Sequence, residues 1–266
     1  MKKSGKKCYV IQHGYTTLAE HFFPLVNGGM IADKMFVWGR TSKEWMIKNG
    51  LDKNNLIITG SPKFDEYHKN NEIRIRIRNI FNIPKTSKII CLIAEANLTQ
   101  KDPRFFLLNK EEMEFYRTMF RNISKEKDLY LIVKPHPSDR HKNFIDEIMR
   151  KENIKNCRIV EKNFPLNALL NQSDIIMTLG STVTLEAMFF KKPIIIIDLF
   201  NKKSMVPFIE NKMCVGINKK ENLISIIRDE IKNRSSVKKY ENVLENYALS
   251  DGKSSERISE IILKNN

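Results

Sequence analysis

Short apolar segments alternate with longer amphipathic segments along nearly the whole chain, and this alternation limits the fold more than any other feature. Each short segment has four to six residues, which is the usual length of a buried strand. Strands that alternate with helices are typical of an α/β protein with a parallel sheet. We therefore predict strands at residues 8–12, 34–38, 56–59, 89–93, 129–134, 157–160, 175–178 and 193–197.

Helices are predicted in the amphipathic segments, at residues 42–49, 110–123, 143–151, 165–171, 183–190, 221–233 and 254–263. Ser61-Pro62-Lys63-Phe64-Asp65 breaks the pattern and is followed by a charged segment, so we expect a boundary there between two α/β units. Residues 1–66 are expected to form an incomplete unit, because they hold only three strands. Residues 67–84 are expected to be a linker, and residues 85–250 a complete nucleotide-binding domain.

The composition is that of a globular protein with an excess of positive charge. Of the 266 residues, 41% are hydrophobic and 29% are charged, which excludes a disordered or fibrous chain. The net charge is +15, but lysine outnumbers arginine 33 to 13 and aromatic residues do not interleave with a basic stripe. We therefore expect no nucleic-acid partner. An anionic membrane surface is another polyanion that this charge would attract.

The sequence shows neither a signal-peptide pattern nor a membrane-spanning apolar run. No apolar run approaches the roughly 18 residues of a membrane span, and the run after the first lysines stops at Gln12-His13-Gly14, which leaves no signal-peptide core. We expect a cytoplasmic protein that is at most peripheral at the inner face of the membrane. The four cysteines lack metal-ligand spacing, so they are expected to be buried free thiols.

The most informative strand end is the run Gly180-Ser181-Thr182, between a predicted strand and a predicted helix. In open α/β sheets, ligands bind outside the carboxyl ends of the strands. Gly180 permits close approach of the backbone, while Ser181 and Thr182 offer hydroxyl groups and amide donors suited to phosphate. The alternative is that Ser181 or Thr182 only caps the helix.

Two histidines also follow predicted strands. His136 lies in Lys134-Pro135-His136-Pro137, where two prolines fix the backbone, and it would donate a hydrogen bond to a phosphate oxygen. His13 lies in Gln12-His13-Gly14 and is a candidate general base, because imidazole groups titrate near neutral pH. The alternative for each is a histidine with only a packing or surface role.

Several enzyme classes lack their signatures in this sequence. We find no P-loop, no dinucleotide-binding glycine pattern, no zinc-protease motif and no serine-hydrolase order. No pair of acidic residues stands at a predicted strand end, so we expect chemistry without a metal or another cofactor.

Six segments, taken in order, resemble GT-B-fold transferases. They are the QHG strand end, the segment from Ala32 to Lys43, the segment from Thr59 to Asp65, the KPHP strand end, the GSTVTLEA turn with Lys192-Pro193, and Asp251-Gly252-Lys253 with Arg257. The resemblance is strongest to CDP-glycerol glycerophosphotransferases and capsule polysaccharide (Kdo and polysialyl) transferases, and UDP-N-acetylglucosamine 2-epimerases are more distant. It covers essentially the whole chain.

This resemblance implies roles for individual residues. His13 matches the histidine proposed as acceptor base, and His136 matches the donor-phosphate histidine. Ser181 and Thr182 match the hydroxyl pair that holds the donor phosphate, and Glu186 matches an acidic residue that contacts the nucleotide ribose. The fold implied is GT-B-like, with residues 1–66 as the remnant of an amino-terminal acceptor domain and residues 251–266 as a helix that crosses back to it.

The resemblance also implies the reaction and its partners. We expect transfer of a sugar or polyol phosphate from a nucleotide sugar or CDP-polyol donor to a glycan or lipid-linked acceptor. The alternatives are a sugar-nucleotide 2-epimerase and a non-catalytic nucleotide-sugar-binding subunit. Because transferases of this type have a longer amino-terminal domain, we expect either a truncated chain or completion by a partner chain or by dimerisation.

Overall fold

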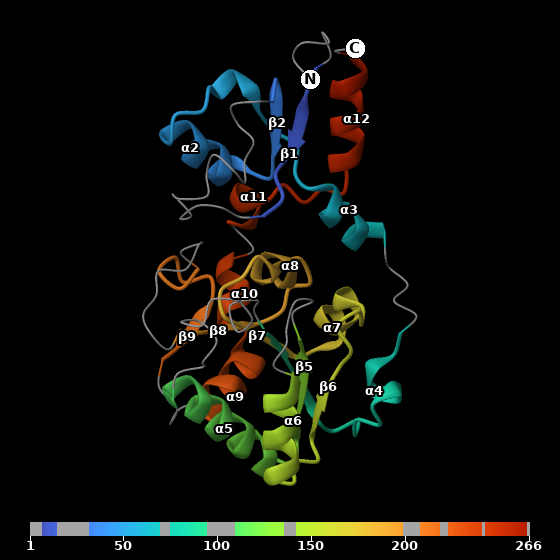
Figure 1. Cartoon of the computed structure of the whole chain (residues 1–266), viewed down its shortest axis with the longest axis vertical. Helices are drawn as coiled ribbons and strands as arrows, with labels where there is room; N and C mark the ends of the chain where they lie inside the picture. Colours follow the sequence, from blue (N-terminus) through green and yellow to red (C-terminus); the bar gives the residue numbers. More distant parts are fainter. Residues whose placement is uncertain are drawn as a thin grey trace. The chain divides into compact units, whose positions relative to one another are not determined.

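The computed structural model describes residues 7–14, 32–69, 75–94, 110–135, 142–198, 208–218, 223–240 and 243–264. These residues form two compact α/β units, each with its own sheet (Figure 1). Unit 1 contains the described residues up to 69 and from 243 onward, and unit 2 contains those from 75 to 240. None of the helices in these ranges is both long enough and apolar enough to span a membrane.

Unit 1 is built on a small parallel sheet. Its strands lie in chain order, β1 (Tyr9–Ile11), β2 (Lys34–Val37) and β3 (Leu56–Ile58). A core of Met35, Val37, Met46 and Leu56 packs beneath them. The helical segments of this unit are α2 (Arg40–Lys48), the 3₁₀ turn η2 (Lys53–Asn55), α3 (Pro62–Lys69), α11 (Leu244–Tyr247) and α12 (Ser254–Lys264).

Unit 2 is built on a six-stranded parallel sheet with the order β6-β5-β4-β7-β8-β9. The strands are β4 (Lys88–Ile93), β5 (Leu129–Lys134), β6 (Cys157–Ile159), β7 (Ile175–Thr178), β8 (Ile194–Ile197) and β9 (Val215–Ile217). The helices are α4 (Ile77–Ile80), α5 (Lys110–Lys125), α6 (Lys142–Lys151), α7 (Leu166–Gln172), α8 (Val183–Phe189), α9 (Leu223–Asn233) and α10 (Ser235–Tyr240).

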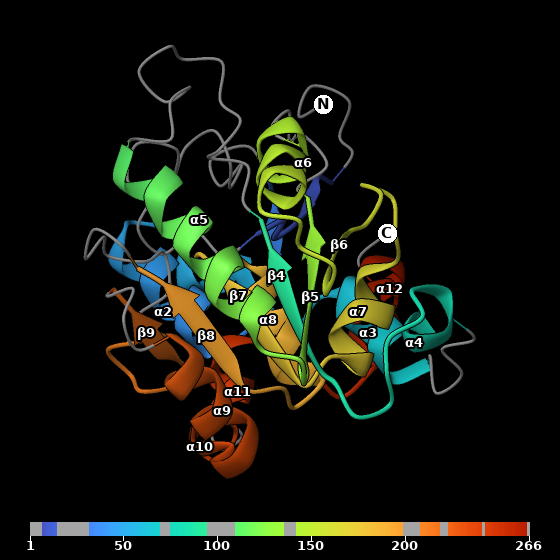
Figure 2. The ribbon, with the colours of Figure 1, turned by 90° about the horizontal axis from the view of Figure 1, so that it is seen from below.

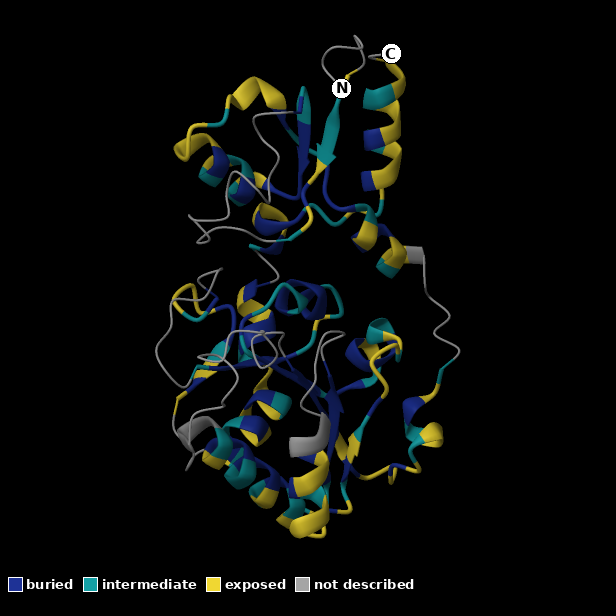
Figure 3. Ribbon diagram, in the orientation of Figure 1, coloured by how far each residue is buried: buried dark blue, intermediate teal, exposed yellow. Residues whose placement is uncertain are grey.

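Both faces of the larger sheet are covered, and its central strands β5, β4, β7 and β8 are almost wholly buried, whereas the edge strands β6 and β9 each have an exposed residue (Figure 3). Alternate residues such as Ile90 and Leu92 belong to one core, which also takes in side chains from α5, α6 and α9. The residues between them, such as Cys91, are equally buried. On the first face α5 and α6 lie side by side (Figure 2), and α7 and α8 contact the strands from the other face. Burial on both faces explains why these strands are continuous apolar runs.

The strand predictions are confirmed, since each of the eight predicted segments contains an observed strand with bounds within one residue at either end. β9 was not predicted, nor were α3, α4, α10 and α11. All seven predicted helices are present. Three of the four cysteines are buried free thiols as expected, whereas Cys8 is partly exposed.

The carboxyl-terminal segment returns to unit 1 through a carboxylate on α3. Asp65 accepts hydrogen bonds from the backbone amides of Ser254 (3.0 Å) and Ser255 (2.7 Å), the first residues of α12, and from the Ser255 hydroxyl (2.8 Å). Burial alone would raise the pKa of Asp65, but these hydrogen bonds lower it below its ordinary value. Asp65 therefore caps α12 from a distant part of the sequence and fixes the helix to unit 1.

A guanidinium group makes the second attachment of α12. Arg257 donates to the carbonyl oxygen of Thr59, just after β3, at 2.6 and 3.1 Å. It also pairs with Asp251 at 2.6 Å. The segments Thr59–Asp65 and Asp251–Arg257, which were singled out by their resemblance to transferases, thus bind one another and have a structural role in the fold.

Candidate functional site

The strand order of unit 2 points to one place on its sheet. After β4 the chain adds β5 and β6 on one side, and it then crosses to add β7, β8 and β9 on the other. In open α/β sheets, ligands bind at such a reversal, outside the carboxyl ends of the two central strands. The reversal here lies between β4 and β7, and the turn that follows β7 is Gly180-Ser181-Thr182.

Two buried threonines hold this turn in shape. The Gly180 amide donates to the Thr178 Oγ1 atom at 3.1 Å, and that hydroxyl is bonded to the Thr184 hydroxyl at 3.0 Å. Both threonines are fully buried. Gly180 has a φ of +97°, a conformation that residues with a Cβ atom rarely adopt. The pair therefore ties the end of β7 to the first turn of α8 across an unusual backbone bend.

The hydroxyl groups of the two residues after Gly180 are not used to cap α8. The Ser181 Oγ atom is buried without a hydrogen-bond partner among the described residues. Thr182 is the residue that precedes α8, and its side chain makes no capping hydrogen bond. The alternative that these hydroxyls only cap the helix is therefore not supported by the contacts. A buried hydroxyl without a partner costs stability, so a ligand that supplied one would be favoured.

Glu186 lies one turn further along, in the first turn of α8. Its side chain is buried, with 1% of the residue exposed. No contact in the described residues tests its predicted role toward a ribose, and that role stays a prediction.

The KPHP strand end is only partly described. Lys134 is the last residue of β5 and is buried, and its Nζ atom donates to the carbonyl oxygens of Lys162 and Pro135. Burial lowers the pKa of Lys134 because the ammonium group loses hydration. Sequence reasoning gave this lysine no role, although a lysine at the end of an apolar strand is a visible signal. His136 lies outside the described residues.

In unit 1 the carboxyl ends of the strands differ in what covers them. At the end of β2 the Leu249 amide donates to the Trp38 carbonyl oxygen at 2.9 Å. Any side chain at Gly39 would collide with the backbone of Tyr247, since a Cβ atom there would lie 2.6 Å from it. Arg257 binds the end of β3. His13, after β1, is exposed. The residues that directly follow β2 and β3 are buried, whereas the imidazole of His13, which lies just beyond β1, is exposed to solvent.

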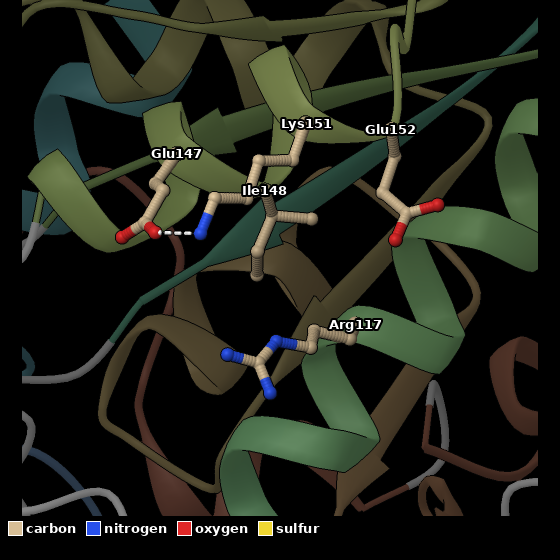
Figure 4. Close-up of a pocket in the computed structure, with 5 residues that line it drawn as sticks. All are labelled: Arg117, Glu147, Ile148, Lys151 and Glu152. Atoms are coloured by element: carbon tan, nitrogen blue, oxygen red, sulfur yellow. Dashed lines mark ion pairs between the residues drawn. The ribbon is translucent and has the colours of Figure 1, made fainter.

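One shallow pocket lies elsewhere, between α5 and α6 (Figure 4). Its lining is Arg117, Glu147, Ile148, Lys151 and Glu152. Lys151 pairs with Glu147, and Glu152 pairs with Arg121, so these charges are largely satisfied within the protein. The pocket adjoins the end of α6 that leads into β6, away from the carboxyl ends of the strands, and we assign no role to it.

Comparison with solved structures gives the class of protein. UDP-GlcNAc 2-epimerase from Neisseria meningitidis bound to UDP-GlcNAc superposes with a TM-score of 0.71 at 17% identity, over 99% of this chain and 71% of that chain. The S. aureus MnaA–UDP co-structure superposes with a TM-score of 0.68 at 16% identity, over 99% of this chain and 69% of that chain. The wall teichoic acid polymerase TagF superposes with a TM-score of 0.70 at 17% identity, over 100% of this chain and 69% of that chain. Two parallel α/β units with these likenesses define a GT-B fold.

The family follows from the sequence itself. The chain belongs to the UDP-N-acetylglucosamine 2-epimerase family, whose sequence model matches residues 28–263. No curated protein sequence matches the chain. The expected GT-B-like fold and the superfamily resemblance are thus confirmed, and the chain is a member of a family of sugar-nucleotide enzymes.

Proposed function

We propose that this chain binds a nucleotide sugar or CDP-polyol and transfers the sugar or polyol phosphate to a glycan or lipid-linked acceptor, without a metal or another cofactor. The observation that carries the proposal is the Gly180-Ser181-Thr182 turn at the reversal of strand order. It combines an unpartnered buried hydroxyl with a glycine bend held by buried threonines. Such a turn suits the phosphate groups that all these donors carry.

The donor would be held mainly by unit 2. Ser181 and Thr182 would hydrogen-bond the phosphate oxygens, and His136 would donate to the leaving phosphate. Glu186 would bind the ribose hydroxyls. These groups would stabilise the charge that develops on the leaving nucleotide, which is the task that a metal ion performs in other transferases.

The acceptor would be activated by His13 of unit 1. Its imidazole would take the proton of an acceptor hydroxyl while the acceptor oxygen forms a bond to the transferred group. The bond from that group to the nucleotide phosphate oxygen breaks, and the nucleotide leaves with the bonding electron pair. The exposure of His13 just after β1 supports this role.

A second candidate reaction is epimerisation of a nucleotide sugar at C2. The match of residues 28–263 to the 2-epimerase family favours it. Both reactions would bind a nucleotide-activated compound through its phosphate groups, and they differ in whether an acceptor is consumed.

The test is incubation of the chain with UDP-, CDP- and CMP-linked donors, with and without a lipid-linked glycan. Transfer predicts nucleotide release that depends on the acceptor. Isomerised donor without an acceptor would establish the epimerase instead, and binding without turnover would indicate a binding subunit. Ser181→Ala/Thr182→Ala is the matched negative control.

The proposed setting is the surface of an anionic membrane, where a lipid-linked acceptor would be found. The net charge of +15 supports it through attraction to acidic lipids. Completion of unit 1 by a partner chain or a second copy belongs to the same proposal.

A further inference from the structure

Gln12 is a buried amide whose hydrogen-bonding groups are all engaged. It directly follows β1, and only 3% of it is exposed. Its Oε1 atom accepts from the Trp38 amide at 2.8 Å. Its Nε2 atom donates to the Gly14 carbonyl oxygen at 2.9 Å and to the Ser42 hydroxyl at 3.1 Å.

The backbone of Gln12 is fixed as firmly as its side chain. Its amide donates to the Phe36 carbonyl oxygen at 2.9 Å, and its carbonyl oxygen accepts from the Trp38 indole at 2.9 Å. Of the five hydrogen bonds that Gln12 makes, four hold it against the end of β2 and the start of α2, and the fifth goes to Gly14. Only a side-chain amide meets these demands, because the site needs one acceptor and two donors from the same group.

One of these bonds has a different purpose from the others. The bonds to Trp38 and Ser42 join Gln12 to neighbouring elements, whereas the bond from Nε2 to Gly14 reaches over His13 and closes the turn that carries it. The backbone is thus fixed on both sides of His13, while the imidazole itself is exposed.

We propose that Gln12 is the positioning residue for the imidazole of His13. This inference rests on the proposed function, in which His13 acts on the acceptor. A general base contributes about 10²–10⁴-fold to a rate only when it is within hydrogen-bond reach of the proton it removes. Displacement by about 1 Å is enough to lose on the order of 10²-fold. An exposed imidazole on a short turn needs such a support, because solvent does not hold it in place.

The test compares Gln12→Glu with Ser42→Ala in the full chain. Gln12→Glu keeps the size and the acceptor for Trp38, but in its ionised form it has no donor for the Gly14 carbonyl oxygen. Ser42→Ala is the matched control, because it removes the other partner of the same Nε2 atom and leaves the bond to Gly14. Gln12→Met provides a neutral variant that also lacks the donors.

The first measurement is the NMR signal of the His13 ring in isotope-labelled protein, assigned with His13→Ala and compared with His68 of the same unit. We expect increased ring motion at His13 in Gln12→Glu and Gln12→Met, with His68 unchanged and with Ser42→Ala like the wild type. The inference is overturned if the ring of His13 is unaffected in folded Gln12 variants, or if Ser42→Ala has the same effect as Gln12→Glu.

The second measurement is turnover with the donor and acceptor that the wild-type chain uses. Gln12→Glu should lower kcat by about 10- to 100-fold and leave the donor KM unchanged, since the donor site is on unit 2. If His13→Ala keeps full turnover, the base assigned in the proposed function is wrong, while the ring signal still decides whether Gln12 orders His13.

Discussion

Replacement of Thr178 by valine tests whether the turn after β7 depends on its buried hydroxyl. Valine keeps the shape of threonine and removes the oxygen that accepts the Gly180 amide at 3.1 Å and pairs with Thr184 at 3.0 Å. The change leaves a buried amide and a buried hydroxyl without their partners. Thr184→Val is the matched control, because the Thr178 oxygen is then still able to accept from Gly180.

The size of the effect follows from these contacts. Each buried polar group left unpaired costs about 1–3 kcal/mol, and Thr178→Val leaves two such groups, so it should lower the free energy of unfolding by about 2–6 kcal/mol. Thr184→Val removes one hydroxyl pair and should cost about 1 kcal/mol. Without its hydrogen bond the Gly180 turn is less ordered in the free protein, so part of the binding free energy must be used to order it. If this ordering costs about 1.4 kcal/mol, the affinity for the nucleotide falls tenfold.

The assay is urea unfolding together with calorimetric titration of UDP and CDP. Thr178→Val should lose stability and about tenfold in affinity, whereas Thr184→Val should bind like the wild type. The variant Thr178→Val/Thr184→Val repeats the test with only the Gly180 amide unpaired. Equal affinity in all three folded variants would refute the link between this hydroxyl and ligand binding.

Three further predictions concern α12, the metal and His13. Asp65→Asn should lower the free energy of unfolding by about 1–3 kcal/mol at pH 7 in urea titrations, because two backbone amides of α12 lose a charged acceptor. Since the pKa of Asp65 is lowered in the folded state, its contribution is complete at neutral pH and is lost as the pH falls below the ordinary value of 3.8. The stability difference from Asp65→Asn should therefore shrink in acid, and a pH-independent difference would contradict the assignment. Turnover should survive EDTA, and loss restored by magnesium or manganese would show that a metal is needed. His13→Ala should cut acceptor-dependent turnover by about 10²–10⁴-fold with little change in donor affinity; loss of donor binding would make it a phosphate ligand instead.

The sequence was most informative about the buried strands of unit 2. β5 and β7 were predicted with their observed bounds, because a strand covered on both faces is a continuous apolar run between polar turns. β9 has three residues with Gly216 at its centre, and this short segment carries no strand signal of its own. It becomes a strand because it pairs with β8.

The break predicted at Ser61-Pro62 marks the start of α3, since proline is well tolerated in the first turn of a helix. Its carboxylate partner could not be foreseen, because Asp65 and Ser254 are 189 residues apart. The same limit applies to the candidate site. The strand ends with Gly180, Ser181 and His13 were visible as motifs, but the supports from Thr178, Thr184 and Gln12 depend on contacts that only the folded chain creates.

The most direct measurement is the affinity of the chain for UDP and CDP with and without the two hydroxyls of the turn after β7. Titration calorimetry should show that Ser181→Ala/Thr182→Ala weakens nucleotide binding by about 1–3 kcal/mol, the usual cost of losing hydrogen bonds to a charged group. The unfolding transition of the double variant should stay close to that of the wild type. Unchanged nucleotide affinity in the stably folded double variant would contradict the claim that this turn binds the donor diphosphate.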